Sequence, residues 1–543
     1  MRVKVSSSLM LVVLAGACGG GKEKTGTGGT GGQTGPADTC VPLKDEQGLV
    51  TSWDCGPTSD DLFDTARLAE VRLTFDPADL AAEVTALRRK GVESKLDTWL
   101  DIIWAKWKHC GPYDNHVPVT MEYKSPDGVG DAVLRQVGIR LRGTKSRGTN
   151  QLQGFKLDFQ ALLPDPLDGE RSRRFGNENK LSLLSIEGDS SLTLQCLAYK
   201  IMRTYGDVPA PRCNHVKVLV DGKLYGVVQS VEEVDDSRFR KHVFSSSKDN
   251  GTLYSCSGGC GYDDSKADLE YYGDQFTEFT GSGPVPAGQY PKAYEPIHIQ
   301  PDHDAGVLDG GVDPNASKKA IETNLIPMFK CGDADSTPDD EAFKTCIEEW
   351  IDVDEWLKVV AAESLMPTVE SFIGAKRNFF LYFKPDQAAP HGGRFVVYSW
   401  DYDAAMVRAG CLPSSCDPFT SVATWYTGGG RPAIVLRLTK VFRDRYCTAM
   451  TAFLRDAYKP ELVDGFAQVL EPALLGATIP FADAFDIAMN KFVPRDPLTH
   501  DVWQEKVMAL RSYIASHRAN AQMQVNAACP AVVPPPVTDG GTP

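Results

Sequence analysis

Two aspartates, Asp401 and Asp403, follow an apolar run, residues 394–399 (RFVVYS), which is typical of a strand. Carboxylates at positions i and i+2 of a strand point the same way, so these two groups could share one divalent cation. Mg²⁺ is the cation that this arrangement favours, because it takes carboxylate and phosphate oxygens together. Asn378 lies upstream, where its amide would be a further ligand. A second interpretation, that both aspartates cap a turn, is the better one for an Asp-x-Asp pair taken alone.

A basic hairpin precedes these carboxylates. A loop with Gly143 and Ser146 lies between two expected strands, residues 137–141 and 155–159, and the second strand carries Lys156. Free backbone N–H groups in such a loop, followed by a strand lysine, are one way to hold nucleotide phosphates. A basic hairpin on a solvated sheet face explains the same residues, and the hairpin alone favours that interpretation.

The elements that follow must position these groups. Asp189 or Ser190 caps an expected helix whose apolar residues recur at helical spacing as far as Met202. Two further strands, 211–220 and 224–231, are joined by a tight Asp-Gly turn and end in an acidic connector. The resulting order is strand, glycine loop, lysine strand, helix, hairpin and acidic connector, which is the order of a kinase-type small lobe. Apart from this helix, residues 66–235 are expected to be mostly strands.

Eight segments occur in a familiar order along the chain. They are 140–143 (RLRG), 155–159 (FKLDF), 181–192, 221–232 (DGKLYGVVQSVE), 378–382 (NFFLY), 398–403 (YSWDYD), 434–454 and 510–518. Together they resemble the CotH (spore-coat protein H) family of atypical protein kinases over about residues 66–528. The resemblance implies an α+β, atypical protein-kinase-like two-lobed fold with a small β-rich lobe and a larger helical lobe.

The resemblance also implies ATP and Mg²⁺ as ligands. It assigns a set of residues to the nucleotide: Arg142, Gly143, Ser146, Lys156 and Glu232. Asp401 then corresponds to the metal-binding aspartate of a kinase DFG motif, with Asn378 and Asp403 as further metal ligands. Members of the family commonly place a catalytic Asp before the Asn-x-x-x-Tyr strand, but residues 366–378 contain no Asp. Glu370 is the carboxylate nearest to that place, and we expect it to be the catalytic base.

Three classes of function remain open. The first is an exported kinase that transfers the γ-phosphate of ATP to Ser or Thr hydroxyls of envelope proteins. The second is a pseudokinase or a surface-binding, structural lipoprotein without catalysis. The third is another Asp-x-Asp enzyme. An aspartyl-phosphate phosphatase would have Thr or Val where this chain has Ala404, and a glycosyltransferase would begin with a nucleotide-binding βαβ unit, which is not evident here.

The first residues resemble a bacterial lipoprotein signal. Arg2 and Lys4 precede an apolar run, 9–14, and small residues lead directly to Cys18, whose thiol would be acylated. A plain signal peptide with an incidental Cys is the alternative. By resemblance to bacterial sorting rules, an Asp directly after the acylated Cys would retain the lipoprotein in the inner membrane. This chain has Gly19 there, which favours the outer membrane or cell surface. The expected segments are: 1–18 lipoprotein signal peptide, 19–60 flexible Gly/Thr-rich tether, 66–235 kinase-like N-lobe, 236–348 insertion or lid, 349–529 helical C-lobe, and 530–543 disordered Pro-rich tail.

Charge and cysteines narrow the partners and the compartment. A net charge of −15 argues against a nucleic-acid partner. The resemblance implies a protein substrate with Ser or Thr acceptors, and the lipid on Cys18 implies a membrane contact. Fourteen cysteines in an exported chain predict disulfides. The expected pairs are Cys40/Cys55, Cys256/Cys260, Cys331/Cys346 and Cys411/Cys416. Cys196, which lies in an apolar helical pattern, is expected to be a free buried thiol.

Overall fold

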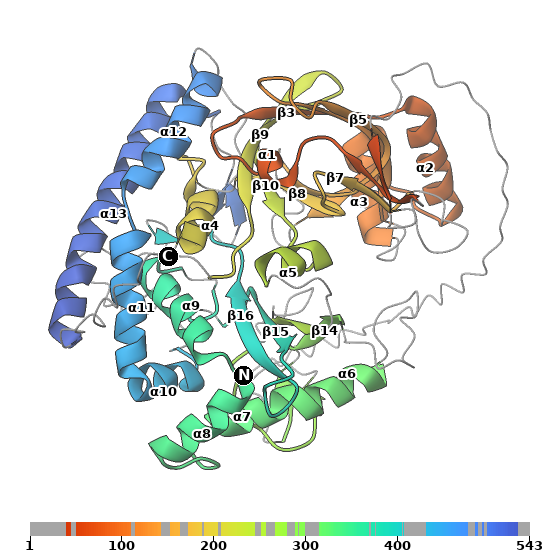
Figure 1. Ribbon diagram of the computed structural model, residues 1–543. Helices are drawn as coiled ribbons and strands as arrows, with labels where there is room; N and C mark the ends of the chain where they lie inside the picture. The colour runs from red at the N-terminus through yellow and green to blue at the C-terminus, as the bar shows by residue number, and fades with distance from the viewer. Residues whose placement is uncertain are drawn as a thin grey trace, which may run out of the picture. The chain divides into compact units, whose positions relative to one another are not determined.

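The computed structural model shows a mixed α+β architecture (Figure 1). The chain divides into two units, Met1–Pro36 and Ala37–Pro543, and every described residue lies in the second. The described residues are 40–44, 50–109, 115–142, 152–162, 172–186, 189–204, 208–244, 251–256, 267–279, 288–291, 293–298, 314–368, 371–374, 376–403, 405–406, 431–475, 484–486, 491–493 and 497–529.

Seven strands form a closed barrel in the order β10-β8-β6-β5-β4-β3-β9. Their bounds are β3 Ala69–Thr74, β4 Val117–Lys124, β5 Ala132–Arg142, β6 Gly154–Asp158, β8 Lys180–Leu184, β9 Cys213–Val220 and β10 Lys223–Glu232. Neighbours are antiparallel except β3 and β9, which are parallel and close the barrel. The strands expected over 137–141, 155–159, 211–220 and 224–231 are therefore confirmed. Asp221 and Gly222, with φ of 48° and 77°, form the turn between β9 and β10.

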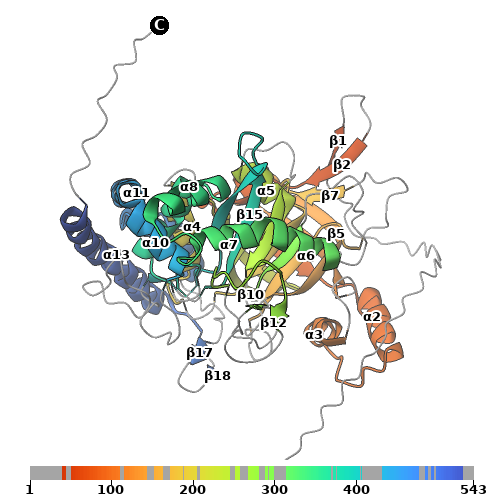
Figure 2. The ribbon, with the colours of Figure 1, turned by 90° about the horizontal axis from the view of Figure 1, so that it is seen from below.

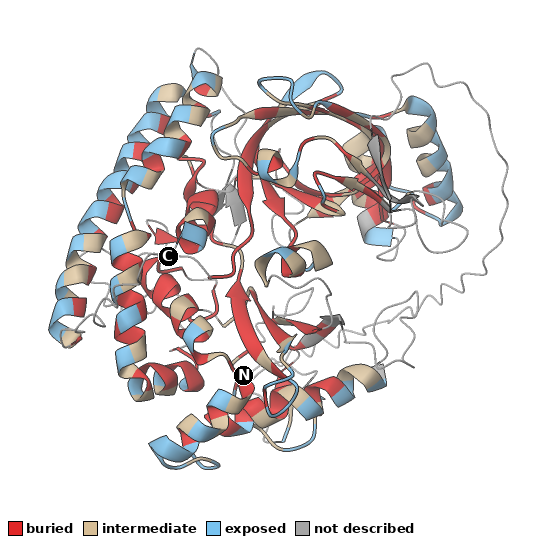
Figure 3. Ribbon diagram, in the orientation of Figure 1, coloured by how far each residue is buried: buried red, intermediate tan, exposed pale blue. Residues whose placement is uncertain are grey.

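Two helices, α2 Pro77–Arg89 and α3 Trp99–His109, lie between β3 and β4. The expectation of a single helix within residues 66–235 is therefore wrong. The N-terminus of α2 is well marked, since Asp76 accepts a hydrogen bond from the Ala78 N–H and Pro77 follows it. However, Leu87 is the buried residue of α2, and most of this helix is exposed (Figure 3). A helix with so narrow an apolar face gives little periodic signal in a sequence.

A small sheet in the order β1-β2-β7 corrects the expected tether (Figure 2). Its strands are β1 Cys40–Lys44, β2 Val50–Cys55 and β7 Ser172–Phe175, and α1 Ser59–Leu62 follows β2. A flexible tether over all of 19–60 is thus wrong for its last part. Residues 40–55 are richer in Val, Leu, Trp and Cys than the Gly- and Thr-rich segment before them, so they can pair as strands where the preceding composition cannot.

A second sheet has the order β14-β11-β15-β16, and helices accompany it. Its strands are β11 Thr252–Cys256, β14 Glu295–His298, β15 Phe379–Pro385 and β16 Gly393–Ser399; two short pairs are β12 Glu278–Phe279 with β13 Tyr290–Pro291 and β17 Ala484–Asp486 with β18 Lys491–Val493. The helices are α4 Leu194–Thr204, α5 Ser237–Val243, α6 Pro314–Ala320, η1 Ile321–Leu325 (a π-helical segment), α7 Ile326–Gly332, α8 Asp340–Trp350, α9 Val353–Leu365, α10 Ala433–Val441, α11 Arg443–Asp456, α12 Glu461–Leu474 and α13 His500–Ala528. Because β11 pairs with β15, the described parts of 236–348 are joined to the rest of the fold.

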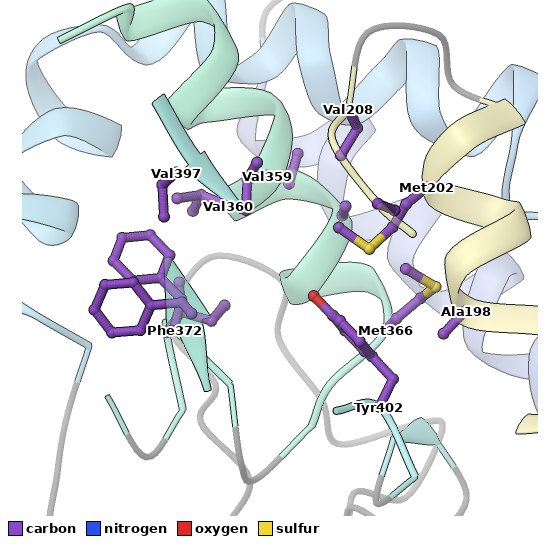
Figure 4. Close-up of a cluster of buried hydrophobic side chains, with 14 of the residues drawn as sticks. Ala198, Met202, Val208, Val359, Val360, Met366, Phe372, Val397 and Tyr402 are labelled. Carbon is purple, nitrogen blue, oxygen red and sulfur yellow. The ribbon is translucent and has the colours of Figure 1, made fainter. Parts of the chain in front are cut away.

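Helix α4 connects two barrel strands in the chain but packs into the core of the helices. Asp189 caps the turn that leads into α4, as expected for this residue. Its carboxylate accepts hydrogen bonds from the N–H groups of Ser191 and Leu194. Figure 4 shows Ala198 and Met202 of α4 beside Met366 and Tyr402, with residues of α9 and β16 on their other side. A separate core fills the barrel.

The disulfides differ in part from those expected. Cys331–Cys346 is confirmed, and Cys55 is disulfide-bonded, with Cys40 opposite it in the β1–β2 register. The expectation for Cys256 is wrong, since it is a free buried thiol. Cys196 is not free either: it bonds to Cys213 and joins α4 to β9. Cys447–Cys529 joins α11 to the end of α13.

Several expectations concern residues outside the described ranges. They are the signal peptide with Cys18, the loop residues Gly143 and Ser146, the base Glu370, the Cys411/Cys416 pair and the tail 530–543. In the part of the chain that is described, no helix combines the length and apolar character needed to cross a membrane.

Candidate functional site

Lys156 lies on the outer face of the barrel strand β6. Its neighbours Phe155 and Leu157 belong to the barrel core, so strand alternation directs Lys156 the other way. The ammonium is nevertheless buried, with 5% of the side chain exposed, and its Nζ lies 2.6 Å from Oε2 of Glu233. Asp235 lies 3.5 Å from the same Nζ. A buried lysine with two carboxylates near it is the first part of the candidate site.

The register of three strands explains why Glu233 meets Lys156. Lys156 pairs with Ser182 of β8, and Ser182 pairs with Val231 of β10. Residues opposite one another in a sheet share a face, so the residue two positions after Val231 returns to the face of Lys156. That residue is Glu233. The hydroxyl of Ser182 also donates a hydrogen bond to it.

Glu232, assigned to the nucleotide by resemblance, lies on the opposite face of β10. Its carboxylate accepts hydrogen bonds from Arg212, at 2.8 Å from Nη2, and Arg212 also reaches Glu178 at 2.8 Å. Burial, together with the charge of Glu232, raises the pKa of Glu178 to about 8, against the pull of Arg212. The structure therefore places Glu232 in a buried ion cluster separate from the Lys156 pair.

Arg142 links the barrel to the segment after β16. One guanidinium nitrogen lies 2.8 Å from Oε1 of Glu233, so this carboxylate binds Arg142 and Lys156 together. The Cζ of Arg142 also lies 4.4 Å from the ring centroid of Trp400, a cation–π contact. Trp400 directly precedes Asp401. Arg142 and Lys156, both expected to bind the nucleotide, thus belong to one connected group with Asp401, the expected metal ligand.

Asp401 and Asn378 lie side by side at the ends of β15 and β16. The register pairs Phe379 with Ser399, and the Trp400 N–H donates to the Asn378 carbonyl at 2.9 Å. The Asn378 amide then reaches Oδ2 of Asp401 at 3.3 Å. Both residues have positive φ, 55° for Asn378 and 71° for Asp401. Such backbone in non-glycine residues costs about 1–3 kcal/mol each and persists where the surroundings hold it, often at functional sites.

Tyr199 of α4 holds the backbone at this point. Its hydroxyl accepts a hydrogen bond from the Asp401 N–H at 3.1 Å, and its ring makes an edge contact with Tyr402 at 5.7 Å between centroids. Burial and the neighbouring Asp401 raise the pKa of Tyr199, so the phenol keeps its proton. Tyr402 donates in turn to the buried Glu363 at 3.0 Å.

The donor set around Asp401 fits a magnesium ion. Strand β16 ends at Ser399, so Asp401 and Asp403 lie beyond the strand and the alternation argument for their common direction does not apply. Asp403 lies near enough for its negative charge to contribute to the raised pKa of Tyr199. Among the described residues, no group of three or more His, Cys, Asp or Glu side chains is arranged to hold a metal ion by itself. One or two carboxylates with an amide, completed by phosphate oxygens and water, is the ligand set that Mg²⁺ favours.

A polar cavity opens beside the ion pair. Its volume is about 480 Å³, and its lining includes Asp158, Lys180, Asp235 and Asp236. Asp235 borders both this cavity and Lys156. Burial raises the pKa of Asp235, but the charges of Lys156, Lys180 and Arg142 outweigh this and lower it, so the carboxyl stays ionised.

The structure thus brings Arg142 and Lys156 together through Glu233, and Asn378 together with Asp401. Sequence reasoning missed Glu233, Tyr199 and the role of Trp400. The strand period narrows the choice to Glu232 or Glu233 but does not select between them, and the Tyr199–Asp401 contact joins residues 202 positions apart and leaves no local signal.

Comparison with known proteins identifies a family. The family model described as CotH kinase protein matches residues 139–520, which include every residue of the candidate site. No curated protein matches the chain.

Proposed function

The chain belongs to the CotH kinase family, and from this we propose that it is a protein kinase that transfers the γ-phosphate of ATP to Ser or Thr hydroxyls with Mg²⁺. In this proposal the barrel and the helices α9–α13 correspond to the small and large lobes of a kinase-like fold. The acceptor belongs to envelope or surface proteins, because we also propose that the chain is exported and anchored by a lipid on Cys18.

One observation carries the proposal. Lys156, Arg142 and Glu233 form a single buried ion cluster, and Arg142 extends it through Trp400 to Asp401. A lysine fixed by a glutamate, linked through Arg142 and Trp400 to an aspartate able to hold Mg²⁺, would provide the two charges that phosphoryl transfer needs. An ion pair that only stabilised the fold would not require the Arg142–Trp400 contact that leads to Asp401.

The reaction would place the phosphates of ATP against Lys156 and Arg142. A bond forms between the acceptor oxygen and the γ-phosphorus while the bond from that phosphorus to the β–γ bridging oxygen breaks, and ADP leaves. The hydroxyl proton passes to the carboxylate of Glu370. Bound at Asp401, Asn378 and Asp403, Mg²⁺ would neutralise charge on the phosphates. The protein contributes mainly position and electrostatic stabilisation.

A pseudokinase is the second candidate, and one observation favours it. Residues 366–378 hold Glu370 where family members commonly have Asp, and the extra methylene of Glu moves the carboxylate. A displacement of about 1 Å at a reacting group can cost on the order of 100-fold in rate. In that case the fold serves as a docking or structural module of a surface-binding lipoprotein, and no phosphate is transferred.

The test measures ATP binding and phosphate transfer separately. Isothermal titration with ATP and Mg²⁺ is followed by incorporation of label from ATP into the chain and into Ser/Thr peptides. We expect Asp401→Asn to remove Mg²⁺-dependent binding, Lys156→Ala to weaken ATP by about 1.5–3 kcal/mol, and Glu370→Gln to stop transfer with binding unchanged. Asp456→Asn, on the surface of α11, is the matched control.

The outcomes separate the two candidates. ATP binding without transfer in the wild-type chain supports the pseudokinase, and gain of transfer in Glu370→Asp would identify a decayed base. Absence of ATP binding in the wild-type chain refutes the kinase.

A further inference from the structure

The backbone of Asp401 receives a contact from a distant helix. Asp401 has φ of 71°, and its N–H donates to the hydroxyl of Tyr199 at 3.1 Å. The two residues are 202 positions apart, and Tyr199 lies on α4, between barrel strands β8 and β9. A left-handed residue is held only where its surroundings determine it, so this hydrogen bond is one of the restraints that fix the direction of the Asp401 side chain.

Tyr199 is itself fixed in place. It has no exposed surface, and its ring rests against Tyr402. Helix α4 is tied to β9 by the disulfide Cys196–Cys213. At the start of α4, the Trp503 indole N–H donates to the Ser191 carbonyl at 3.0 Å. A side chain anchored in this way can set the position of a neighbour, because it cannot easily move with that neighbour.

The contact also joins the two parts of the candidate site. Lys156 and Glu233 lie on the barrel, whereas Asp401 and Asn378 lie at the end of the second sheet. Arg142 bridges them over Trp400, on one side of Asp401 in the sequence. Tyr199 acts on Asp401 itself and comes from the segment that connects β8 and β9, both of them barrel strands.

We propose that Tyr199 is a positioning residue, whose hydroxyl holds the Asp401 backbone in the conformation that directs the Asp401 carboxylate to the metal. This inference rests on the proposed function, since it concerns the same site. It assigns no contact between Tyr199 and substrate or metal. The competing explanation is that Tyr199 only fills the core, in which case the ring matters and the hydroxyl does not.

The test compares two buried tyrosines that each lose a hydroxyl. Tyr199→Phe removes the acceptor of the Asp401 N–H. Tyr254→Phe is the matched control, because Tyr254 is equally buried in the same core and donates to the Ala320 carbonyl at 3.0 Å, far from Asp401 in the sequence. Mn²⁺ serves as the metal probe, titrated with a non-hydrolysable ATP analogue present. Hydrogen exchange of the peptide spanning 399–403 reports on the Asp401 amide without any ligand.

The expected result is specific to Tyr199→Phe. Mn²⁺ affinity falls about 3- to 10-fold, the range that one lost hydrogen bond gives, and exchange of the 399–403 peptide becomes faster by a similar factor. The affinity for the nucleotide without metal stays at its wild-type value, and Tyr254→Phe changes neither quantity.

Two outcomes overturn the inference alone: wild-type Mn²⁺ affinity in Tyr199→Phe, or an equal loss in Tyr254→Phe. If the wild-type chain binds no Mn²⁺ with the nucleotide analogue, the proposed metal site fails, and the inference fails with it.

Discussion

Oε2 of Glu233 lies 2.6 Å from Nζ of Lys156, and both side chains are almost completely buried. The other carboxylate oxygen lies 2.8 Å from Arg142, so one anion neutralises two cations away from water. A buried charge that loses its partner destabilises the folded state, so breaking this pair should lower the free energy of unfolding measurably.

Replacing Glu233 by Gln should therefore destabilise the fold strongly. The change keeps the shape but leaves Arg142 without its anion and Lys156 with only Asp235, 3.5 Å away, and breaking a buried pair costs about 3–5 kcal/mol. Urea unfolding measures the loss. Lys217→Met is the control, because Lys217 is 41% exposed beside Glu70 and a surface pair is worth about 0–1 kcal/mol. Equal losses in the two variants would contradict this interpretation of the pair.

The disulfides should differ in their contribution to stability. Cys447–Cys529 spans 82 residues, whereas Cys196–Cys213 and Cys331–Cys346 span 17 and 15. The chain-entropy model then gives about 4.5 kcal/mol for the long loop and about 3 kcal/mol for each short one. Replacing both cysteines of one bridge by Ala, one bridge at a time, and measuring unfolding by denaturant tests this order. A smaller loss for Cys447–Cys529 than for both others would contradict it.

Glu178 should make stability fall as the pH rises. Burial, with the charge of Glu232, raises its pKa from 4.5 to about 8, so between these values the folded chain holds a proton that the unfolded chain has lost. This contribution is complete below pH 4.5 and is lost as the pH approaches and passes 8. Glu178→Gln keeps the neutral form, so relative to wild type the variant should gain stability from pH 5 to 8.

A second carboxylate provides the control for this pH series. The pKa of Glu70 is lowered, since hydrogen bonds and charges from Arg72 and Lys217 outweigh its partial burial. Its contribution is therefore present above pH 4.5 and is lost only in more acidic solution, so Glu70→Gln should show no trend from pH 5 to 8. A parallel trend in both variants would show that Glu178 is not the source.

Cys18 should decide where the chain resides. If its thiol is acylated, Cys18→Ser should abolish incorporation of a fatty-acid probe and prevent processing at that position. Metabolic labelling in a bacterial host, followed by fractionation, measures both. Equal label in wild type and variant would refute the anchor, while the plain signal peptide would leave both proteins exported and unlabelled.

Much of the barrel could be predicted from the sequence, because alternation and turn chemistry act locally. The β9–β10 hairpin shows this, since its Asp221-Gly222 turn and its alternating residues are both explicit in the sequence. Lys156 and Asp401 were also identified, with help from the resemblance. Helix α2 was missed, and only Leu87 of it is fully buried, with Leu80 and Val84 partly buried against the barrel core.

The partners within the site could not be predicted to the same extent. Choosing between Glu232 and Glu233 requires the phase of β10 relative to Lys156, and a shift of one residue exchanges the two faces. Cys196 was predicted to be buried, which is correct, but burial alone does not separate a free thiol from a disulfide. Its partner Cys213 lies in β9, and only the packing of α4 against that strand brings Cys196 and Cys213 together.

The course of α4 has a consequence for how the chain acquires its structure. The last barrel strands, β9 and β10, follow α4, and β9 closes the barrel against β3. Yet the apolar face of α4 contacts α12 and belongs to the same hydrophobic core as residues of α9 and α13, all of which come much later in the chain. A fragment ending after residue 235 would therefore complete its barrel while exposing Leu194, Leu197, Ile201 and Met202 to water. We expect such a fragment to aggregate, and the full chain to unfold in one cooperative transition, so that nascent chains emerging from synthesis depend on assistance until α13 has been made.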